Sequence, residues 1–220
     1  RNVNLHIYET LYARDENAKP VPELAEGVKI SADGKTYVFP IRKGVKFHNG
    51  KELDAQDIAA SIDRYRKVGA SPALVSAIDT IKASGTHEVT ITLKAPQSTL
   101  LDNISSPRAP IPIYPASEAA KEAGKIEFIG TGPYKFVEYK PDSHVKMTRY
   151  DGYSPNPNGK QERDGFAGRK EAYIDTVTFR FMPEAGARAA ALEAGEIQHN
   201  ETLDGPTAKR LAGDKRIAIY

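Results

Sequence analysis

Residues 23–65 read ELAEGVKISADGKTYVFPIRKGVKFHNGKELDAQDIAASIDRY, and this stretch predicts a hairpin, then a loop, then a helix. Two runs rich in β-forming residues, 27–31 and 36–41, enclose the tetrapeptide Ala-Asp-Gly-Lys at 32–35. An Asp-Gly pair tolerates the positive φ angles that tight hairpin turns require. The second run alternates apolar and polar residues, which indicates a sheet with one apolar face. Pro40 within that run predicts an edge strand or a bulge.

A helix is predicted to begin directly after Asp54. Asp54 has the side chain of a good N-cap, and Asp57 lies three residues further on, where a capping box places its second acceptor. Apolar residues then recur at helical spacing, which predicts that one stripe of the helix packs on the sheet. The residues of this stripe are Ala55, Ile58, Ala59, Ile62 and Tyr65.

The same stretch resembles a known protein family. From Ala25 to Arg64 the chain reads A-E-G-V-x-x-S-A-D-G-K-T-Y-x-F-x-I-R-K-G-V-K-F-H-N-G-K-x-L-x-A-Q-D-I-x-x-S-I-D-R. This run is similar, without gaps, to the hallmark of bacterial extracellular solute-binding protein family 5, the dipeptide-, oligopeptide- and nickel-binding class that serves ABC importers. Two shorter motifs also resemble the family, namely G-T-G-P-Y at 130–134 and A-L-x-x-G-E-I at 191–197.

The resemblance implies an α/β fold: a type II periplasmic-binding-protein lobe, with a mixed sheet and flanking helices, plus an inserted α+β subdomain. It assigns residues 1–10 and 131–220 to the discontinuous main lobe. Residues 11–130, which contain the hallmark, form the inserted accessory subdomain. Members of the family are much longer and have two lobes. We therefore expect an N-terminal fragment in which the second lobe, and with it half of the cleft, is absent.

Composition excludes several classes of protein. The chain has 220 residues, a formal net charge of +2 and no cysteine. Acidic and basic residues are interspersed, so no nucleic acid is expected as a partner. The absence of cysteine excludes disulfides and thiolate sites. No run approaches the roughly 18 apolar residues of a membrane span, and no secretion signal opens the chain, which a processed or trimmed N-terminus would explain.

Outside the hallmark, the pattern of the sequence predicts a series of short elements. A helix is expected within residues 3–11 by resemblance. Predicted strands cover residues 78–83, 88–94, 134–139, 144–150, 174–181, 197–200 and 215–220, and predicted helices cover residues 73–77, 98–104, 117–123, 184–194 and 205–211. Four prolines between residues 107 and 115 hold the chain extended, and the apolar Ile111 and Ile113 among them favour a packed crossing over a ligand for an SH3 domain.

Two segments are rich in glycine without being phosphate sites. The Gly-Thr-Gly of residues 130–132 lacks the lysine of a phosphate-binding loop and leads into a strand, which favours a purely backbone role. Residues 151–172 mix prolines, glycines and charges without periodicity, and here the chain is longer than the usual family pattern. We expect residues 151–172 to form a surface excursion.

The sequence carries no signature of an enzyme or of a metal site. It has no G-x-S-x-G elbow and no H-E-x-x-H motif. Its five histidines are scattered, whereas a metal cage needs at least three converging ligands. The histidines are His6, His48, His87, His144 and His199. We expect no catalytic residue, metal or cofactor, and we interpret the first four histidines as solvated or hairpin residues.

The candidate ligand contacts are His199, Asn200, Glu201, Thr202 and Arg108. His199 is predicted to end a strand, where ligands meet the sheet edge in open α/β domains, and the resemblance places its turn on the cleft side. The next three residues offer polar groups to a ligand amine or amide. Arg108 suits a carboxylate, because one guanidinium can donate two parallel hydrogen bonds to it.

The resemblance implies that the intact protein captures a small solute, above all an oligopeptide, by closing two lobes and presenting the solute to an ABC transporter permease. It implies a periplasmic location or a lipoprotein at the cell surface. With half of the cleft absent, we expect the fragment to bind solute weakly or not at all, and to self-associate through its exposed hinge face. Two alternatives stay open, a self-standing interaction or assembly module that pairs with another chain, and a hydrolase.

Overall fold

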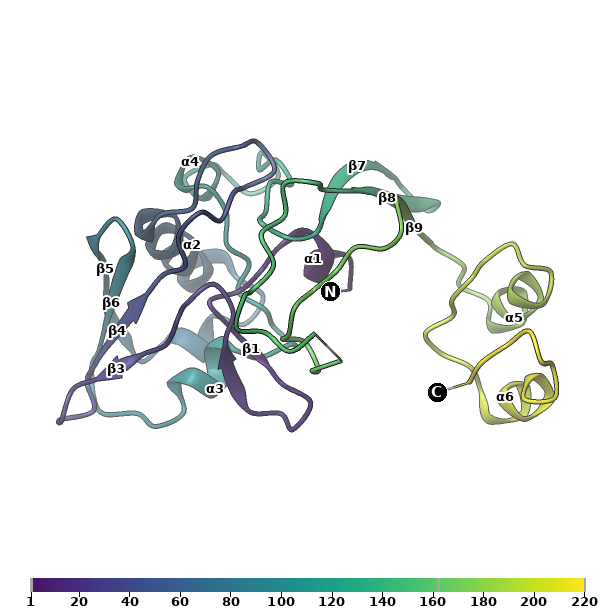
Figure 1. Ribbon diagram of the computed structural model, residues 1–220, viewed down its shortest axis with the longest axis horizontal. Helices are drawn as coiled ribbons and strands as arrows, with labels where there is room; N and C mark the ends of the chain where they lie inside the picture. The colour runs from purple at the N-terminus through teal and green to yellow at the C-terminus, as the bar shows by residue number, and fades with distance from the viewer. Residues whose placement is uncertain (1, 162, 220) are drawn as a thin grey trace. The chain divides into compact units, whose positions relative to one another are not determined.

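The computed structural model describes residues 2–161 and 163–219 (Figure 1). Its contacts divide the chain into two compact units. The first unit is Arg1–Glu138 with Lys146–Val177, and the second is Tyr139–Val145 with Thr178–Tyr220. This division differs from the predicted boundaries at residues 10 and 130, because contacts join the hallmark to the segments before and after it. The predicted boundaries stay a prediction about the lobes.

A four-stranded antiparallel sheet lies at the centre of the first unit. In spatial order its strands are β3 (Lys29–Ile30), β4 (Thr36–Pro40), β6 (Glu88–Leu93) and β5 (Ile78–Gly85). Both predicted hairpins are confirmed. β4 lies inside the sheet without a bulge, so the prediction for Pro40 is wrong. Proline is tolerated there because it is the last residue of β4, and the next amide, Ile41 N, donates to His87 O over 2.9 Å.

The Asp-Gly turn between β3 and β4 has the predicted geometry. Gly34 adopts φ +68°, in the left-handed region that glycine enters without steric cost. Asp33 Oδ1 accepts a hydrogen bond from Lys35 N at 3.1 Å, and Ser31 N donates to Thr36 O at 2.9 Å. The turn is therefore closed by local bonds alone, which is why the sequence reveals it.

Helix α2 (Ala55–Val68) begins with a complete capping box. Asp54 and Asp57 each accept a hydrogen bond from the other's amide at 3.0 Å. The predicted stripe of the helix is buried and packs against β5 and β6. Asp57 is buried as well, which the sequence did not predict, because its second oxygen accepts from Ala116 N at 2.7 Å. One carboxylate thus fixes the start of α2 and the start of α4 (Ala116–Ala119).

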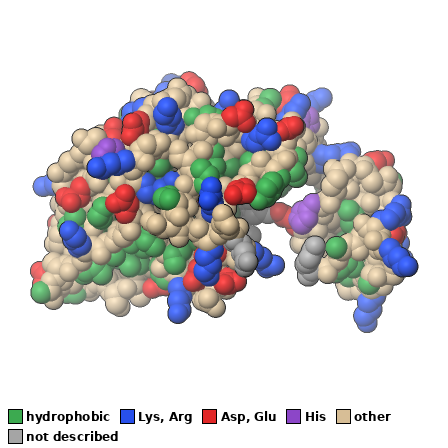
Figure 2. Space-filling view, in the orientation of Figure 1, with side chains coloured by type: hydrophobic (Ala, Val, Ile, Leu, Met, Phe, Trp, Pro, Cys, Tyr) green, Lys and Arg blue, Asp and Glu red, His purple; other side chains and the backbone are tan. Residues whose placement is uncertain are grey.

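The apolar core of the first unit lies mainly between α2 and the sheet. Its largest fully buried side chains include Phe39, Phe47, Ile41, Leu53 and Ile58. Each of these stabilises the fold by about 1.5–3 kcal/mol relative to an exposed position. On the face in view in Figure 2, basic and acidic side chains are interspersed over the outside of this unit.

Short elements complete the first unit. They are α1 (Asn2–Ile7), β1 (Tyr12–Arg14), β2 (Pro20–Pro22), the 3-10 helix η1 (Pro72–Val75), α3 (Leu100–Ile104) and α4 (Ala116–Ala119). β1 and β2 pair antiparallel. Ile111 and Ile113 are buried, so the predicted packed crossing is confirmed. α4 is shorter than the predicted helix at 117–123, because the amide of Lys121 turns back to Glu118 O at 3.0 Å.

The Gly-Thr-Gly of residues 130–132 lies against the end of α1. Gly132 N donates to Ile7 O over 2.9 Å. A Cβ atom at Gly130 would lie 2.0 Å from Ile7 O, a distance no side chain can occupy. The glycines therefore allow two backbones to meet, as the sequence predicts.

A second sheet has the strand order β7 (Tyr134–Lys140), β8 (His144–Arg149) and β9 (Thr176–Arg180). The predicted hairpin of β7 and β8 is confirmed, and its turn places Asp142 at φ +57°. Between β8 and β9 the described residues form no helix or strand, as predicted for residues 151–172. They are nevertheless not a loose excursion, because Asn156 and Asp164 are buried within the first unit.

The second unit contains helices α5 (Ala185–Glu193) and α6 (Gly205–Leu211), both predicted. An ion pair between Arg210 and Glu193 joins the two helices. The predicted strand at 197–200 is wrong, because Ile197 N bonds to Ala191 O and extends the end of α5. The predicted strand at 215–220 is also wrong for residues 215–219, where Ile217 N bonds back to Asp214 O in a turn. Tyr220 lies outside the described residues.

Candidate functional site

The predicted contacts fall into two groups, one in each unit. His199, Glu201 and Thr202 are exposed in the turn between α5 and α6, and Asn200 is half-buried. Asn200 Oδ1 accepts a weak hydrogen bond from Thr202 N at 3.4 Å, and its buried Nδ2 has no partner among the described residues. His199 does not end a strand, so that argument for ligand contact is lost. The turn gathers these four side chains because they are consecutive, whereas Arg108 belongs to the other unit.

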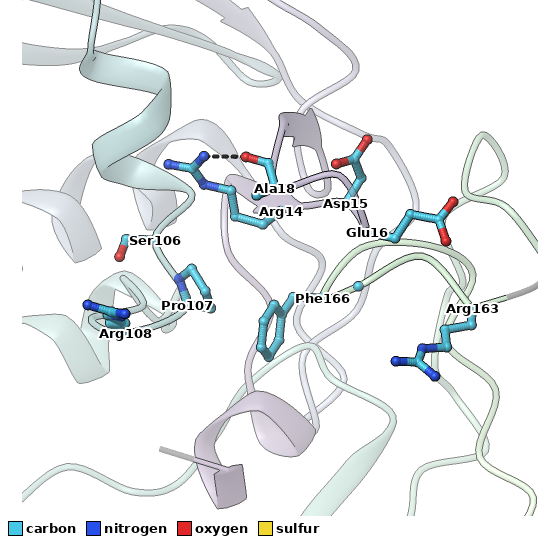
Figure 3. Close-up of a pocket in the computed structure, with 10 residues that line it drawn as sticks. Arg14, Asp15, Glu16, Ala18, Ser106, Pro107, Arg108, Arg163 and Phe166 are labelled. Atoms are coloured by element: carbon cyan, nitrogen blue, oxygen red, sulfur yellow. Dashed lines mark hydrogen bonds between the residues drawn. The ribbon is translucent and has the colours of Figure 1, made fainter. Parts of the chain in front are cut away.

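Arg108 lies at a hollow of about 470 Å³ in the first unit, which we call the Arg108 pocket (Figure 3). Three stretches of chain line the pocket: the tip of the hairpin between β1 and β2, the segment after α3, and part of the 151–172 segment. The lining residues are Arg14, Asp15, Glu16, Ala18, Ser106, Pro107, Arg108, Arg163, Gly165 and Phe166. The volume is in the range of small-molecule sites.

Most charges that line the Arg108 pocket are already engaged. Arg14 donates to Ala18 O and, over 2.9 Å, to Asp102 O, and it pairs with the Asp102 carboxylate at 3.0 Å. Asp15 Oδ1 accepts from the amides of its own turn, including Lys19 N at 2.8 Å. Glu16 pairs with Lys160 at 3.2 Å. Arg14 and Glu16 are therefore ion-paired, and the Asp15 carboxylate is engaged by amides of its own turn.

Two further arginines, Arg108 and Arg163, line the pocket. Arg108 and Arg163 are exposed, and neither makes an ion pair or hydrogen bond with another residue in the ranges 2–161 and 163–219. Figure 3 shows their guanidinium groups on opposite sides of the pocket, with the Phe166 ring between them. Planar guanidinium groups bind carboxylates by paired hydrogen bonds. The pocket thus offers two anion-binding groups beside an apolar surface.

The hairpin tip that lines the pocket is held in a costly conformation. Ala18 adopts φ +59°, which costs a residue with a Cβ atom about 1 kcal/mol. Its amide donates to Asp15 O at 3.0 Å, and its carbonyl accepts from Arg14. Strained backbone of this kind concentrates at functional sites. The positive φ of Ala18 belongs to the turn between β1 and β2, which also bonds Asp15 N to Lys19 O at 3.0 Å.

Residues 163–166 were not predicted as part of a site. Gly165 has φ +64°, and a Cβ atom there would lie 2.6 Å from Asp15 O. Phe166 N donates to Arg14 O over 2.8 Å. The tip of the 151–172 segment is therefore fastened to the β1–β2 hairpin. The signal available in the sequence was the length of this segment, which exceeds the family pattern.

A buried ionic cluster anchors the base of the 151–172 segment. Lys170 bonds to Oε1 of Glu23, and Oε2 of Glu23 accepts a hydrogen bond from Thr10 N at 2.8 Å. Arg42 lies 3.8 Å from Glu9 Oε1 and donates to Ser154 O at 2.6 Å. Arg42, two residues beyond β4, is buried, and the carboxylate and carbonyls around it allow its burial.

Glu9 is the strained member of this cluster. It is 1% exposed, and its Oε2 has no hydrogen-bond partner among the described residues. Burial, followed by the neighbouring carboxylate of Glu23, raises the pKa of Glu9 to about 7, against the opposing charges of Lys170 and Arg42. Thr131 Oγ1 is also buried and unpartnered within the described chain. Near neutral pH, Glu9 is therefore poised between its charged and neutral forms.

His48 is a structural residue and not a solvated one, which corrects the prediction. Gly130 N donates to its Nδ1 at 3.3 Å, and its Nε2 lies 2.9 Å from Gly132 O. This arrangement requires the neutral ring with its proton on Nε2. Burial lowers the pKa of His48, consistent with the neutral form. The ring joins the hallmark to the Gly-Thr-Gly element, so it is not available to a ligand.

Within residues 2–161 and 163–219, no cluster of three or more His, Asp or Glu side chains could hold a metal ion. Among the helices of the same ranges, none is long and apolar enough to cross a membrane.

Comparison with known proteins reveals a consistent set of similarities. The sequence model of the family described as bacterial extracellular solute-binding proteins, family 5 Middle, matches residues 19–220. The glutathione-binding protein GsiB of Pectobacterium atrosepticum is 31% identical over 218 residues, which cover 97% of this chain and 40% of that protein. This chain therefore spans less than half the length of that relative.

Solved structures show the same relationship. The crystal structure of NikA from Brucella suis in complex with Fe(III)-EDTA superposes with a TM-score of 0.74 at 32% identity, over 89% of this chain and 37% of that one. The oligopeptide-binding protein AppA from Bacillus subtilis, in complex with a nonapeptide, gives a TM-score of 0.71 at 28% identity, over 89% and 38%.

Proposed function

Because the chain belongs to family 5 of the bacterial extracellular solute-binding proteins, we propose that it supplies one wall of a solute site and that Arg108 binds a carboxylate of the solute. The structural matches establish the predicted fold class, a lobe of a type II periplasmic binding protein. The observation that supports the proposal is the unneutralised guanidinium of Arg108 at the mouth of a 470 Å³ pocket.

The proposed solute is a small peptide. GsiB is named for glutathione, and AppA was solved with a nonapeptide. Peptides carry a terminal carboxylate, and glutathione and EDTA carry several, so a guanidinium suits all of them. The polar groups of the turn at His199–Thr202 are proposed as a separate contact for a solute.

In the proposed mechanism the protein binds its solute and no covalent bond is formed or broken. A two-lobed binding protein shifts between open and closed forms, and the solute favours the closed form by contacts that exist only there. The protein would act outside the cytoplasmic membrane and deliver its solute to an ABC transporter permease. Since this chain covers about 40% of GsiB, the affinity of a closed cleft would depend on residues beyond these 220.

Isothermal titration calorimetry with the gene product that carries this sequence tests the proposal. Reduced glutathione and the tripeptide Ala-Ala-Ala serve as probes. Arg108→Gln removes a charge-assisted hydrogen bond and should weaken binding roughly ten- to a hundredfold. Lys29→Gln, which removes an exposed charge from β3, is the matched control and should bind normally. Equal affinities for Arg108→Gln and the unsubstituted protein would disprove the assigned role.

A further inference from the structure

The 151–172 segment is built into the first unit at both of its ends. Near its start, Arg42 donates to Ser154 O at 2.6 Å and to Pro155 O at 3.0 Å, and Asn156 Nδ2 donates to Pro22 O at 3.2 Å. Near its end, Lys170 bonds to the buried Glu23. These bonds hold both ends of the 151–172 segment in place, because they reach groups that are distant in the sequence.

The middle of the segment is closed on itself. Arg169 N donates to Lys160 O at 2.8 Å, and Ala167 N donates to Asp164 O at 3.0 Å. Gly159 packs so closely on Gly168 that a Cβ atom would lie 2.6 Å from the Gly168 carbonyl carbon. These bonds close the two sides of a loop, and the loop's tip at residues 163–166 is held against the β1–β2 hairpin by Phe166 N, which donates to Arg14 O.

The two nearby acids share a single lysine. Lys160 pairs with Asp164 at 3.0 Å and with Glu16 at 3.2 Å. Neither of these carboxylates forms an ion pair with Arg163. The Arg163 guanidinium lines the Arg108 pocket and makes no ion pair with any described residue (Figure 3).

We propose that the 151–172 segment determines the specificity of the Arg108 pocket, and that Arg163 and Phe166 select peptides with an acidic side chain. This inference rests on the proposed function. Arg108 holds the terminal carboxylate, the Phe166 ring covers the apolar part of the peptide, and Arg163 receives the second carboxylate. A peptide with one anionic group leaves Arg163 without a partner and loses its contribution.

An isosteric pair of peptides tests the selection. Calorimetry compares Ala-Glu-Ala with Ala-Gln-Ala, which differ in charge and hardly in shape. The unsubstituted protein should prefer Ala-Glu-Ala by roughly ten- to a hundredfold, as expected for one hydrogen-bonded ion pair. Arg163→Gln should abolish this preference while leaving the affinity for Ala-Gln-Ala unchanged. Arg108→Gln should weaken both peptides and leave their ratio intact.

Additional variants separate selection from folding. Lys29→Gln should keep the preference, and thermal unfolding of Arg163→Gln should match that of the unsubstituted protein, because Arg163 is exposed. Phe166→Ala should weaken both peptides. A preference that survives Arg163→Gln would overturn the inference, and so would equal binding of the two peptides by the unsubstituted protein. The absence of binding by any peptide would overturn the proposed function as well.

Discussion

The hallmark hairpin and helix differ from the 151–172 segment in what holds them. In residues 23–65, turn, cap and core stripe follow from neighbours within a few positions, such as Asp33 with Lys35 and Asp54 with Asp57. The described residues of the 151–172 segment form no helix or strand. Their anchors lie over a hundred residues away, as in the pair of Lys170 with Glu23. Order therefore arises from local bonds in one region and from distant ionic bonds in the other.

Among the variants that test this difference, Lys170→Ala should lower the free energy of unfolding most. It leaves the buried carboxylates of Glu23 and Glu9 without their ammonium partner, which should lower the free energy of unfolding by about 3 kcal/mol or more. Urea denaturation measures the loss, and limited proteolysis should cut within residues 151–172 first. Lys125→Ala, from the exposed pair with Glu122, should cost less than about 1 kcal/mol. Equal stability of the two variants would show that the cluster does not anchor the segment.

Glu9→Gln should show a somewhat smaller effect that depends on pH. The pKa of Glu9 is raised from 4.5 to about 7, so the folded protein holds a proton that the unfolded chain releases. The stability that protonated Glu9 contributes is fully present below about pH 4.5. This stability is lost as the pH rises through about 7, by at most about 3 kcal/mol.

Gln cannot ionise, so Glu9→Gln should be more stable than the unsubstituted protein at pH 8 and similar to it at pH 4.5. Urea denaturation across this range measures the difference. Tyr153→Phe, which removes the hydroxyl that donates to Glu9 Oε1 at 3.2 Å, keeps the carboxylate and should keep the pH dependence. A Glu9→Gln variant whose stability follows pH like that of the unsubstituted protein would contradict this assignment.

Asp54→Ala tests the local side of the comparison. Loss of the N-cap should lower the free energy of unfolding by about 1 kcal/mol. Asp54→Asn retains an acceptor for Asp57 N and should cost less. Far-UV circular dichroism during urea denaturation reports both. If proteolysis within residues 151–172 accelerates as much as in Lys170→Ala, the two regions are not held independently.

Ala18→Gly should give the smallest effect, and with the opposite sign. Glycine relieves the positive φ at the hairpin tip, so the variant should be more stable by up to about 1 kcal/mol. Ala13→Gly, a buried strand position in β1 with ordinary backbone, should be destabilised instead. If Ala18→Gly also loses affinity for Ala-Glu-Ala, the strain serves the pocket and not the fold.

Part of the site was readable from the sequence and part was not. Arg108 was predicted to bind a carboxylate. It lines a pocket and makes no ion pair with any described residue, and its contact with a ligand stays a prediction. The predicted contacts at His199–Thr202 stay a prediction as well. Arg163 and Phe166 were missed, because nothing in their local pattern shows that Gly165 packs against Asp15.

The sequence by itself determined the family, the two hairpins β3–β4 and β5–β6, the helix α2, and the hairpin of β7 and β8. Their signals repeat every two or three to four residues, and their caps and turns are closed by neighbours. Tertiary structure alone decided that Asp57, Arg42 and Glu9 are buried, that two predicted strands in residues 197–219 do not form, and that the 151–172 segment lines a pocket. Burial of a charge depends on partners brought together from distant positions, and a strand needs a neighbour to pair with, so neither can be read from a local pattern.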